Sequence, residues 1–230
     1  MTEPAGPART LCCDVVLFDL DGVLADSTAS VERHWRTWAR EHGIDVDLVL
    51  RTVHGRRAIE TIGLLAPHLD AGDEVARLSA REAEDAGDVL GVAGAAALLA
   101  ALPPARWGIV TSGTRAVAEA RLRVVGITPP PMMVTADDVT RGKPDPEGYL
   151  LGARRLGAEP SRCVVVEDAP LGVDAAHAAG MRALGVATTY PAAALARAEV
   201  VAESLGAVSV RVVGGEIELS VGQGVNDQPG

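Results

Sequence analysis

The chain is poor in aromatic residues and has no long apolar run, which argues against an aromatic core and against a membrane-spanning helix. Aromatic residues make up 3% of its 230 residues, whereas hydrophobic residues reach 48%. The core must therefore be built from aliphatic side chains. A membrane-spanning helix needs about 18 or more consecutive apolar residues, and the sequence contains no such run. We therefore expect no membrane partner.

Cysteine is also scarce. The three cysteines are Cys12, Cys13 and Cys163, so the number is odd and two are adjacent. A disulfide framework is not expected from this pattern, and a reducing cytoplasm is the predicted location. Residues 1–10 contain two prolines and a glycine but no apolar segment. They are predicted to be a frayed tail rather than a signal peptide.

Basic residues are too few for a nucleic-acid-binding face. There are 21 Lys and Arg against 31 Asp and Glu, which gives a net charge of −10. Nucleic acid binding requires a basic surface that neutralises phosphates, and no basic cluster occurs, so we expect no nucleic acid partner. An acidic protein that handles an anionic ligand must gather positive charge locally. The oligomeric state is not readable from these features.

Short apolar runs alternate with helical stretches along most of the chain. Runs of this kind are typical of buried parallel strands. The alternation predicts an α/β fold, with a Rossmann-like parallel sheet covered by helices on both faces. The expected strands are 15–18, 107–110, 163–166, 183–186 and 200–201, and the expected helices between them are 115–124, 146–156 and 171–179.

Two regions depart from this alternation. From about residue 28 to residue 88 the pattern is helical throughout, which predicts an inserted all-helical cap at 27–88 and a discontinuous core of 1–26 and 89–230. The hinges are expected near 25–28 and 87–94, where small residues occur. At the other end, 208–213 and 216–221 flank a Gly-Gly pair and predict a C-terminal β-hairpin, and disorder is expected over 222–230.

Two polar motifs follow predicted strands. Asp19 and Asp21 come directly after the first strand and are followed by Gly22. At the carboxyl end of a parallel strand, one carboxylate can attack a ligand while the other moves protons. Ser112 and Gly113 follow the second strand and suit a phosphate oxygen. Taken alone, the first motif is equally explained by an Asp-rich turn, whereas the second is better explained by helix capping.

Two further motifs complete the set. Lys143 lies in Gly142-Lys143-Pro144-Asp145-Pro146, where the prolines stiffen the turn that carries the lysine. Glu167 and Asp168 end another apolar run, and buried acids are costly unless they are solvated or metal-bound. Magnesium prefers such oxygen ligands. An exposed turn lysine and a helix-capping Asp168 are the plainer interpretations. All four motifs nevertheless fall at strand ends on one edge of one sheet, which favours an active site.

The four motifs resemble those of the haloacid dehalogenase-like hydrolase superfamily. They stand here as Asp19-Leu-Asp-Gly-Val-Leu, Val110-Thr-Ser-Gly, Gly142-Lys-Pro-Asp-Pro-Glu and Val166-Glu-Asp-Ala-Pro. The match runs in order from about residue 14 to residue 201, and the helical insert resembles the cap that follows the first motif. More narrowly, the chain is similar to the glycerol-phosphate and 2-deoxyglucose-6-phosphate phosphatases.

The resemblance implies a role for each site residue. Asp19 would be the nucleophile that forms an aspartyl-phosphate, and Asp21 would be the acid and then the base. Mg²⁺ would be bound by Asp19, by the backbone carbonyl of Asp21, by Asp168, and by Glu167 directly or through water. The phosphoryl group would be held by Ser112 and Lys143 within a binding segment that also includes Leu20, Gly22 and Gly113.

The cap is expected to determine specificity through the loop at His54, Gly55, Arg56 and Arg57. Arg57 matches an arginine of the subgroup in position. Two plainer interpretations stay open, namely that Arg57 is a solvated arginine on a helix face and that His54 is a structural histidine.

These observations predict a Mg²⁺-dependent phosphomonoesterase that acts on small sugar or polyol phosphates. A phosphomutase with the same nucleophile is an alternative, and net phosphate release would distinguish the two. A non-catalytic phosphate-binding module is a second alternative, and the intact Asp19, Asp21, Lys143 and Asp168 argue against it. A dehalogenase is disfavoured because the resemblance gives that branch no use for Asp21 as an acid. The physiological substrate is not readable from the sequence.

Overall fold

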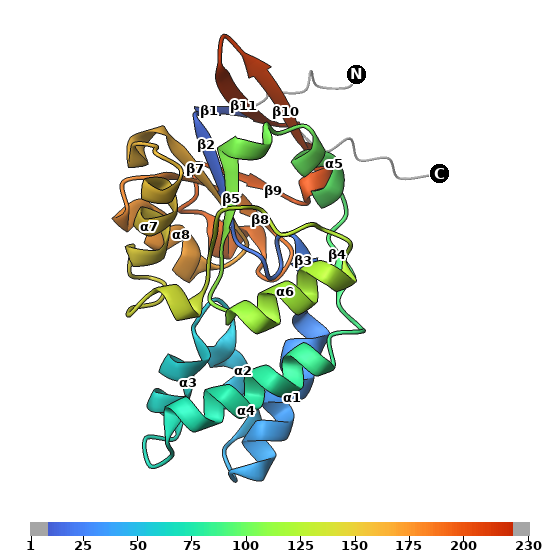
Figure 1. The fold of residues 1–230 in the computed structure, drawn as a ribbon, viewed down its shortest axis with the longest axis vertical. Helices are drawn as coiled ribbons and strands as arrows, with labels where there is room; N and C mark the ends of the chain where they lie inside the picture. Colours follow the sequence, from blue (N-terminus) through green and yellow to red (C-terminus); the bar gives the residue numbers. More distant parts are fainter. Residues whose placement is uncertain (1–8, 223–230) are drawn as a thin grey trace.

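The computed structural model describes residues 9–222, and its centre is a parallel sheet (Figure 1). The sheet has the order β6-β5-β2-β7-β8-β9, and every neighbouring pair is parallel. Its strands are β2 (Val15–Phe18), β5 (Trp107–Val110), β6 (Met133–Val134), β7 (Cys163–Glu167), β8 (Arg182–Val186) and β9 (Val200–Ala202). All five strands expected in the core are present, and β6 is an addition.

Helices cover both faces of this sheet, as predicted. They are α5 (Ala95–Ala100), α6 (Arg115–Val124), α7 (Glu147–Arg155) and α8 (Pro170–Ala178). Successive residues of a strand point to opposite faces. Val16 and Phe18 of β2 accordingly pack in the apolar cluster that includes α5 and α6, while Leu17 packs in the cluster that includes α7 and α8. β2 is therefore buried on both sides.

Short 3₁₀ segments connect several of these elements. They span Pro104–Arg106, Ala136–Asp138, Pro160–Arg162, Ala192–Leu195 and Leu205–Ala207.

The predicted helical insert follows β2 and has its own core. It consists of α1 (Thr28–Glu41), α2 (Val46–Val53), α3 (Ala58–Leu65) and α4 (Ala71–Glu84). Trp35 and Trp38 lie in its apolar cluster, and their rings meet edge to face with centroids 5.3 Å apart. This cluster is separate from the two that flank the main sheet. The domain boundary at 27–88 stays a prediction.

The two segments that join the insert to the core lie side by side. β3 (Ala25–Asp26) precedes the insert and pairs antiparallel with β4 (Leu90–Gly91), which follows it. These two strands fall within the predicted hinge segments 25–28 and 87–94. The insert is therefore connected to the core through one short ribbon.

The predicted C-terminal hairpin is confirmed, and it belongs to a larger sheet. β10 (Val208–Val213) pairs with β11 (Glu216–Val221), and β11 also pairs with β1 (Arg9–Cys13). The expectation of a frayed tail over 1–10 was wrong for Arg9 and Thr10, because a strand more than 200 residues away in the sequence supplies their pairing partner. Disorder was expected over 222–230, but Gly222 is ordered enough to donate its N–H to the carbonyl of Ala207 at 3.1 Å. Residues 1–8 of the tail and residues 223–230 lie outside the described residues.

Across residues 9–222, no helix is both long enough and apolar enough to cross a membrane.

Candidate active site

The predicted site residues lie together at the carboxyl ends of neighbouring strands. Asp19 follows β2, Ser112 comes two residues after β5, and Glu167 ends β7. These three strands are adjacent in the sheet order, and the backbone N–H of Asp19 donates to the carbonyl of Val166 at 3.0 Å. The position is the usual ligand-binding edge of an open α/β sheet.

Lys143 lies at the centre of a buried ionic cluster. Its Nζ donates to Asp19 Oδ1 at 2.8 Å and to Glu167 Oε1 at 2.6 Å. The three residues are 6%, 4% and 0% exposed, so these charges interact away from water, where they attract strongly but are costly to leave unpaired. These two contacts fix the Lys143 ammonium group beside Asp19, in agreement with the prediction that Lys143 is a positioned charge.

The Glu167 carboxylate is surrounded by donors. Besides Lys143, Oε1 accepts from the hydroxyl of Tyr149 at 2.8 Å. Oε2 accepts from the backbone N–H groups of Asp168 at 3.0 Å and Ala169 at 3.1 Å. Four donors account for the lone pairs of one carboxylate. We therefore interpret Glu167 as the residue that orients Lys143, which leaves direct metal binding to its neighbours.

Burial changes the proton affinity of this cluster. It raises the pKa of Asp19, and Lys143 opposes that rise while the nearby carboxylates of Glu167 and Asp21 add to it. Burial likewise raises the pKa of Asp168, again with Glu167 and Asp19 adding to the rise. Burial on its own lowers the pKa of Lys143, but Asp19 and Glu167 outweigh it and the pKa is raised. The lysine therefore stays charged.

The acids of this cluster fit a hard divalent cation. Asp19, Glu167 and Asp168 each place an oxygen within 4.8 Å of the others. Lys143 pairs with Asp19 and Glu167 but not with Asp168, so the three carboxylates carry more negative charge than this one ammonium group offsets. A buried excess of negative charge is costly, and oxygen ligands of this kind suit Mg²⁺. With Glu167 engaged by its donors, Asp19 and Asp168 are the carboxylates suited to hold the ion.

Gly22 makes room for Asp168. A side-chain Cβ at this position would lie 1.8 Å from Asp168 Oδ2, and the backbone φ is +76°, so only glycine fits. The Gly22 N–H donates to the carbonyl of Ala25 at 2.8 Å. In this structure the predicted phosphate-binding glycine is thus a turn and spacing residue. Its contact with phosphate stays a prediction.

Asp21 is held by two side chains that the motifs do not include. Its Oδ1 accepts from Ser27 Oγ and from Arg121 Nη1, both at 2.7 Å. Arg121 donates at the same time to Glu82 Oε2 at 2.6 Å. Burial raises the pKa of Glu82, although Arg121 opposes the rise. An arginine of α6 in the core thus joins Asp21 to α4 of the cap.

Sequence reasoning missed Arg121 and Glu82, and a signal for Arg121 existed. It falls on the same helix face as Val117 and Ala118, which are buried. A charged residue on an apolar face requires a partner, although the sequence does not say which partner.

The remaining residues of the predicted phosphate-binding set make internal contacts. Ser112 Oγ donates to the carbonyl of Gly55 at 3.0 Å, and the Gly113 N–H donates to Thr111 Oγ1 at 3.1 Å. Leu20 is fully buried, and its carbonyl accepts from the N–H of Leu24 at 2.8 Å. The phosphate contacts predicted for these three residues stay predictions.

One cavity is lined from both the core and the cap. The core contributes Asp19, Asp21, Gly22, Ser112, Gly113 and Asp168, and the cap contributes His54, Gly55 and Arg56. The His54 ring meets Tyr190 edge to face at 6.4 Å, and burial lowers the His54 pKa. These cap residues thus line the same cavity as the core acids, and their role in specificity stays a prediction.

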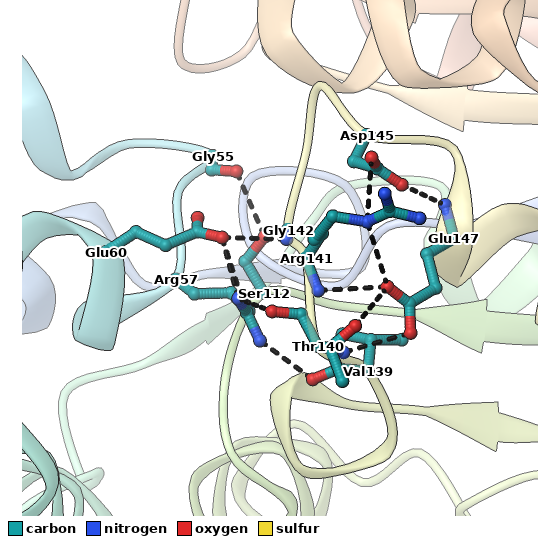
Figure 2. Close-up of polar contacts among 10 residues, drawn as sticks. All are labelled: Gly55, Arg57, Glu60, Ser112, Val139, Thr140, Arg141, Gly142, Asp145 and Glu147. Atoms are coloured by element: carbon teal, nitrogen blue, oxygen red, sulfur yellow. Dashed lines mark hydrogen bonds and ion pairs between the residues drawn. The ribbon is translucent and has the colours of Figure 1, made fainter.

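Arg57 does not line this cavity. Its guanidinium donates to the backbone carbonyls of Val139 and Thr140 in the core and to Glu60 beside it (Figure 2). Arg57 is 7% exposed, so the alternative of a solvated arginine on a helix face was wrong. Its predicted role in specificity has no direct contact to support it here.

Comparisons with known proteins agree with this geometry. Residues 13–180 match the model of the haloacid dehalogenase-like hydrolases. The chain is 42% identical to hexitol phosphatase A of Escherichia coli (strain K12), over 86% of this chain and 94% of that protein. It is 35% identical to glycerol-1-phosphate phosphohydrolase 2 of Saccharomyces cerevisiae (strain ATCC 204508 / S288c), over 79% of this chain and 77% of that protein.

A solved structure shares the same fold. A hydrolase from Pseudomonas syringae has a TM-score of 0.71 and is 28% identical, and the match covers 83% of this chain and 93% of that chain. The expected resemblance to sugar-phosphate and polyol-phosphate phosphatases is confirmed. With its four motifs gathered at one sheet edge, the chain belongs to the haloacid dehalogenase-like hydrolase family.

Proposed function

We propose that this hydrolase is a Mg²⁺-dependent phosphomonoesterase for small sugar or polyol phosphates, with Asp19 as its nucleophile. The observation that carries the proposal is the pairing of Asp19 with Lys143, at 2.8 Å, beside a cavity that the cap also lines. The family match and the phosphatase names of its relatives support the reaction class.

In the first step an Asp19 oxygen attacks phosphorus, so an O–P bond to Asp19 forms as the ester O–P bond breaks. The Lys143 ammonium stabilises the negative charge that Asp19 and the phosphoryl oxygens bring together. Asp21 donates a proton to the departing alkoxide, and the alcohol leaves. Ser27 and Arg121, both 2.7 Å from Asp21 Oδ1, keep this carboxyl group in one position.

In the second step water replaces Asp19 on phosphorus. Asp21, now ionised, accepts a proton from the water as its oxygen bonds to phosphorus and the Asp19 O–P bond breaks. Inorganic phosphate leaves, and Asp19 and Asp21 return to their starting states. When bound by Asp19, Asp168 and the backbone carbonyl of Asp21, Mg²⁺ would neutralise the charges of the nucleophile and the phosphate.

The proposed substrate class combines two kinds of support. The relatives are named for hexitol and glycerol-1-phosphate hydrolysis, and the cap contributes the polar side chains of Thr28, His54 and Arg56 to the cavity wall. Hydroxyl-rich leaving groups suit such a wall, because each hydroxyl can both donate and accept a hydrogen bond. Expression in a reducing cytoplasm remains part of the proposal, in line with three free cysteines.

The direct test is phosphate release with Mg²⁺ from an aryl phosphate and from a panel of sugar and polyol phosphates. We expect release from the aryl ester and faster release from some members of the panel. Isomerised substrate without net phosphate would instead indicate a phosphomutase. Absence of all turnover from about pH 5 to about pH 9 would contradict the catalytic proposal and leave a phosphate-binding module.

Asp19→Asn tests the nucleophile. The amide keeps the shape of the side chain but cannot form the acyl phosphate, so we expect turnover to be abolished while the circular dichroism spectrum is unchanged. Residual turnover well above background would exclude Asp19 as the nucleophile.

A further inference from the structure

Arg57 connects the cap to a core loop through backbone carbonyls. It lies immediately before α3, and its Nη1 and Nη2 donate to the carbonyls of Val139 at 2.8 Å and Thr140 at 2.5 Å. Nε and Nη2 also donate to Glu60 Oε1, at 3.1 Å and 2.7 Å. All three guanidinium nitrogens therefore donate to protein acceptors. Figure 2 shows this side chain directed at the loop.

Glu60 reaches the same loop one helical turn further on. Its Oε1, which accepts from Arg57, also accepts from the backbone N–H of Gly142 at 2.8 Å. A Cβ at Gly142 would lie 2.7 Å from Glu60 Oε2 and 2.8 Å from Arg57 Nε. This position therefore leaves no space for a side chain while the pair is in place. We call Arg57 and Glu60 the cap brace.

The loop to which the cap brace is hydrogen-bonded carries Lys143. The cap brace bonds to this loop at the carbonyls of Val139 and Thr140 and at the N–H of Gly142, and Lys143 is the next residue in the chain. On its other side the loop is held by Glu147, whose carboxylate accepts from the N–H groups of Thr140 at 3.0 Å and Arg141 at 2.9 Å. Figure 2 shows the loop between Glu60 and Glu147.

We propose that Arg57 and Glu60 are positioning residues that hold the Lys143 loop, so that Lys143 meets Asp19 in the reactive geometry only while the cap is docked. This inference rests on the role of Lys143 in the proposed function. It gives Arg57 an effect on every substrate, because the residue acts through Lys143 and not through the leaving group.

Kinetics on two substrates test the proposal. Arg57→Ala and Glu60→Ala are each assayed with an aryl phosphate and with the best sugar or polyol phosphate. We expect kcat to fall about 10- to 100-fold on both substrates by the same factor, since small displacements of a positioned group have effects of this size. A rise in KM confined to the sugar or polyol ester would instead make Arg57 a substrate contact and overturn the proposal.

A double variant and two conservative variants sharpen the result. Because the two side chains act as one unit, Arg57→Ala with Glu60→Ala should lose no more turnover than either single variant. Glu60→Gln keeps an oxygen acceptor for Gly142 and should recover part of the turnover. Arg57→Lys cannot reproduce the planar fork and should recover little. If the losses of turnover from the two single variants multiplied in the double variant, Arg57 and Glu60 would act independently, which would contradict the proposal.

Amide hydrogen exchange supplies a readout that does not depend on activity. In Glu60→Ala the loop 139–143, and Gly142 above all, should exchange faster than in the parent protein. Arg81→Ala is the matched control, because Arg81 is also a cap arginine paired with a glutamate, Glu41, but both are exposed and within the cap. It should leave exchange in the loop and kcat unchanged. Unchanged exchange in Glu60→Ala would overturn the proposal.

Lys143→Ala separates this inference from the proposed function. If Lys143→Ala is inactive while both cap-brace variants keep the parent kcat per folded molecule, the cap brace is wrong and the proposed function stands. If Lys143→Ala retains the parent kcat, the role of Lys143 in the proposed function is wrong. Thermal unfolding of every variant supplies the folded fraction, so that a merely structural loss is not counted as lost turnover.

Discussion

Two groups of charged side chains flank the site, and they differ in burial and in what they connect. Lys143 with Asp19 and Glu167 is buried, and all three residues belong to the core. Arg57 with Glu60 crosses from the cap to a core loop, and the Glu60 side chain is 27% exposed. The first group places charge where the proposed reaction would occur, whereas the second could affect that reaction only by positioning the Lys143 loop.

A third group combines both properties. Arg121 is buried like Lys143, yet it joins Asp21 of the core to Glu82 of the cap. The comparison teaches that burial determines how much stability an ionic group controls, because an uncompensated buried charge is costly. Whether the loss of an ionic group affects the reaction or the docking of the cap depends on which parts of the molecule that group connects.

Lys143→Ala should have the largest effect on both stability and turnover. It leaves Asp19 and Glu167 buried without their cation, so we expect a loss of about 3–5 kcal/mol in the free energy of unfolding together with loss of measurable turnover. Urea unfolding and phosphate release measure the two effects. A stability within about 1 kcal/mol of the parent protein would contradict the buried-cluster interpretation.

Arg121→Ala should destabilise the protein by about 3 kcal/mol, since it removes the partner of a buried glutamate. Replacing Arg121 by Met and Glu82 by Leu together removes both charges of the buried pair, so most of that stability should return. Turnover should stay low in the double variant, because Asp21 has lost its arginine. Urea unfolding and kcat check these effects, and full recovery of kcat would remove Arg121 from the positioning of Asp21.

Mg²⁺ should stabilise the folded protein through the core acids. Binding to the folded state alone raises the free energy of unfolding by about 2.7 kcal/mol at 100 times the dissociation constant. Thermal unfolding with Mg²⁺ and with a chelator measures the shift. Asp168→Asn should abolish most of it, whereas Glu167→Gln should retain more, because Glu167 is engaged by four donors. The reverse order would reassign the ligands.

Glu147→Gln should have the smallest effect, and it gives a pH signature. Hydrogen bonds from Thr140 lower the pKa of Glu147 to about 2, below its ordinary value of 4.5. The stabilisation that this carboxylate supplies is therefore fully present above about pH 4.5 and is lost as the pH falls through about 2. Acid unfolding of Glu147→Gln should be less steep over that range, and an unchanged profile would show that the carboxylate does not hold the loop.

Local sequence pattern was enough to predict much of the fold. The apolar runs at 107–110 and 163–166 are strands, and the helix at 115–124 lies where its periodicity places it. β6 has only two residues, directly after three consecutive prolines and a methionine, which is too short for a periodicity. β1 was missed because its pairing partner lies at the other end of the chain.

The site residues also fall into two sets, those that local sequence pattern could place and those that meet only in the tertiary structure. The placement of Asp19, Lys143 and Asp168 at one sheet edge could be predicted, because each stands directly after a strand or on a rigid turn and parallel strands bring their carboxyl ends to one edge. Arg57 was predicted as a specificity residue, and no local pattern could show that its acceptors are carbonyls more than 80 residues further along the chain. Arg121 and Glu82 likewise meet only through the packing of two helices.

By itself, the order of residues determined the predicted reaction class, because the proposed reactive groups are adjacent to elements that local periodicity reveals. It also determined the family, through motifs that need no contact map. The tertiary structure alone decided which charged groups meet across the cap and the core. The reason is physical: a strand end depends on neighbours in sequence, whereas an ion pair or a carbonyl contact between two units depends on how their surfaces pack. Lys143 depends on both, since a turn set by the local sequence carries it and the distant side chains of Arg57 and Glu60 contact the loop before that turn.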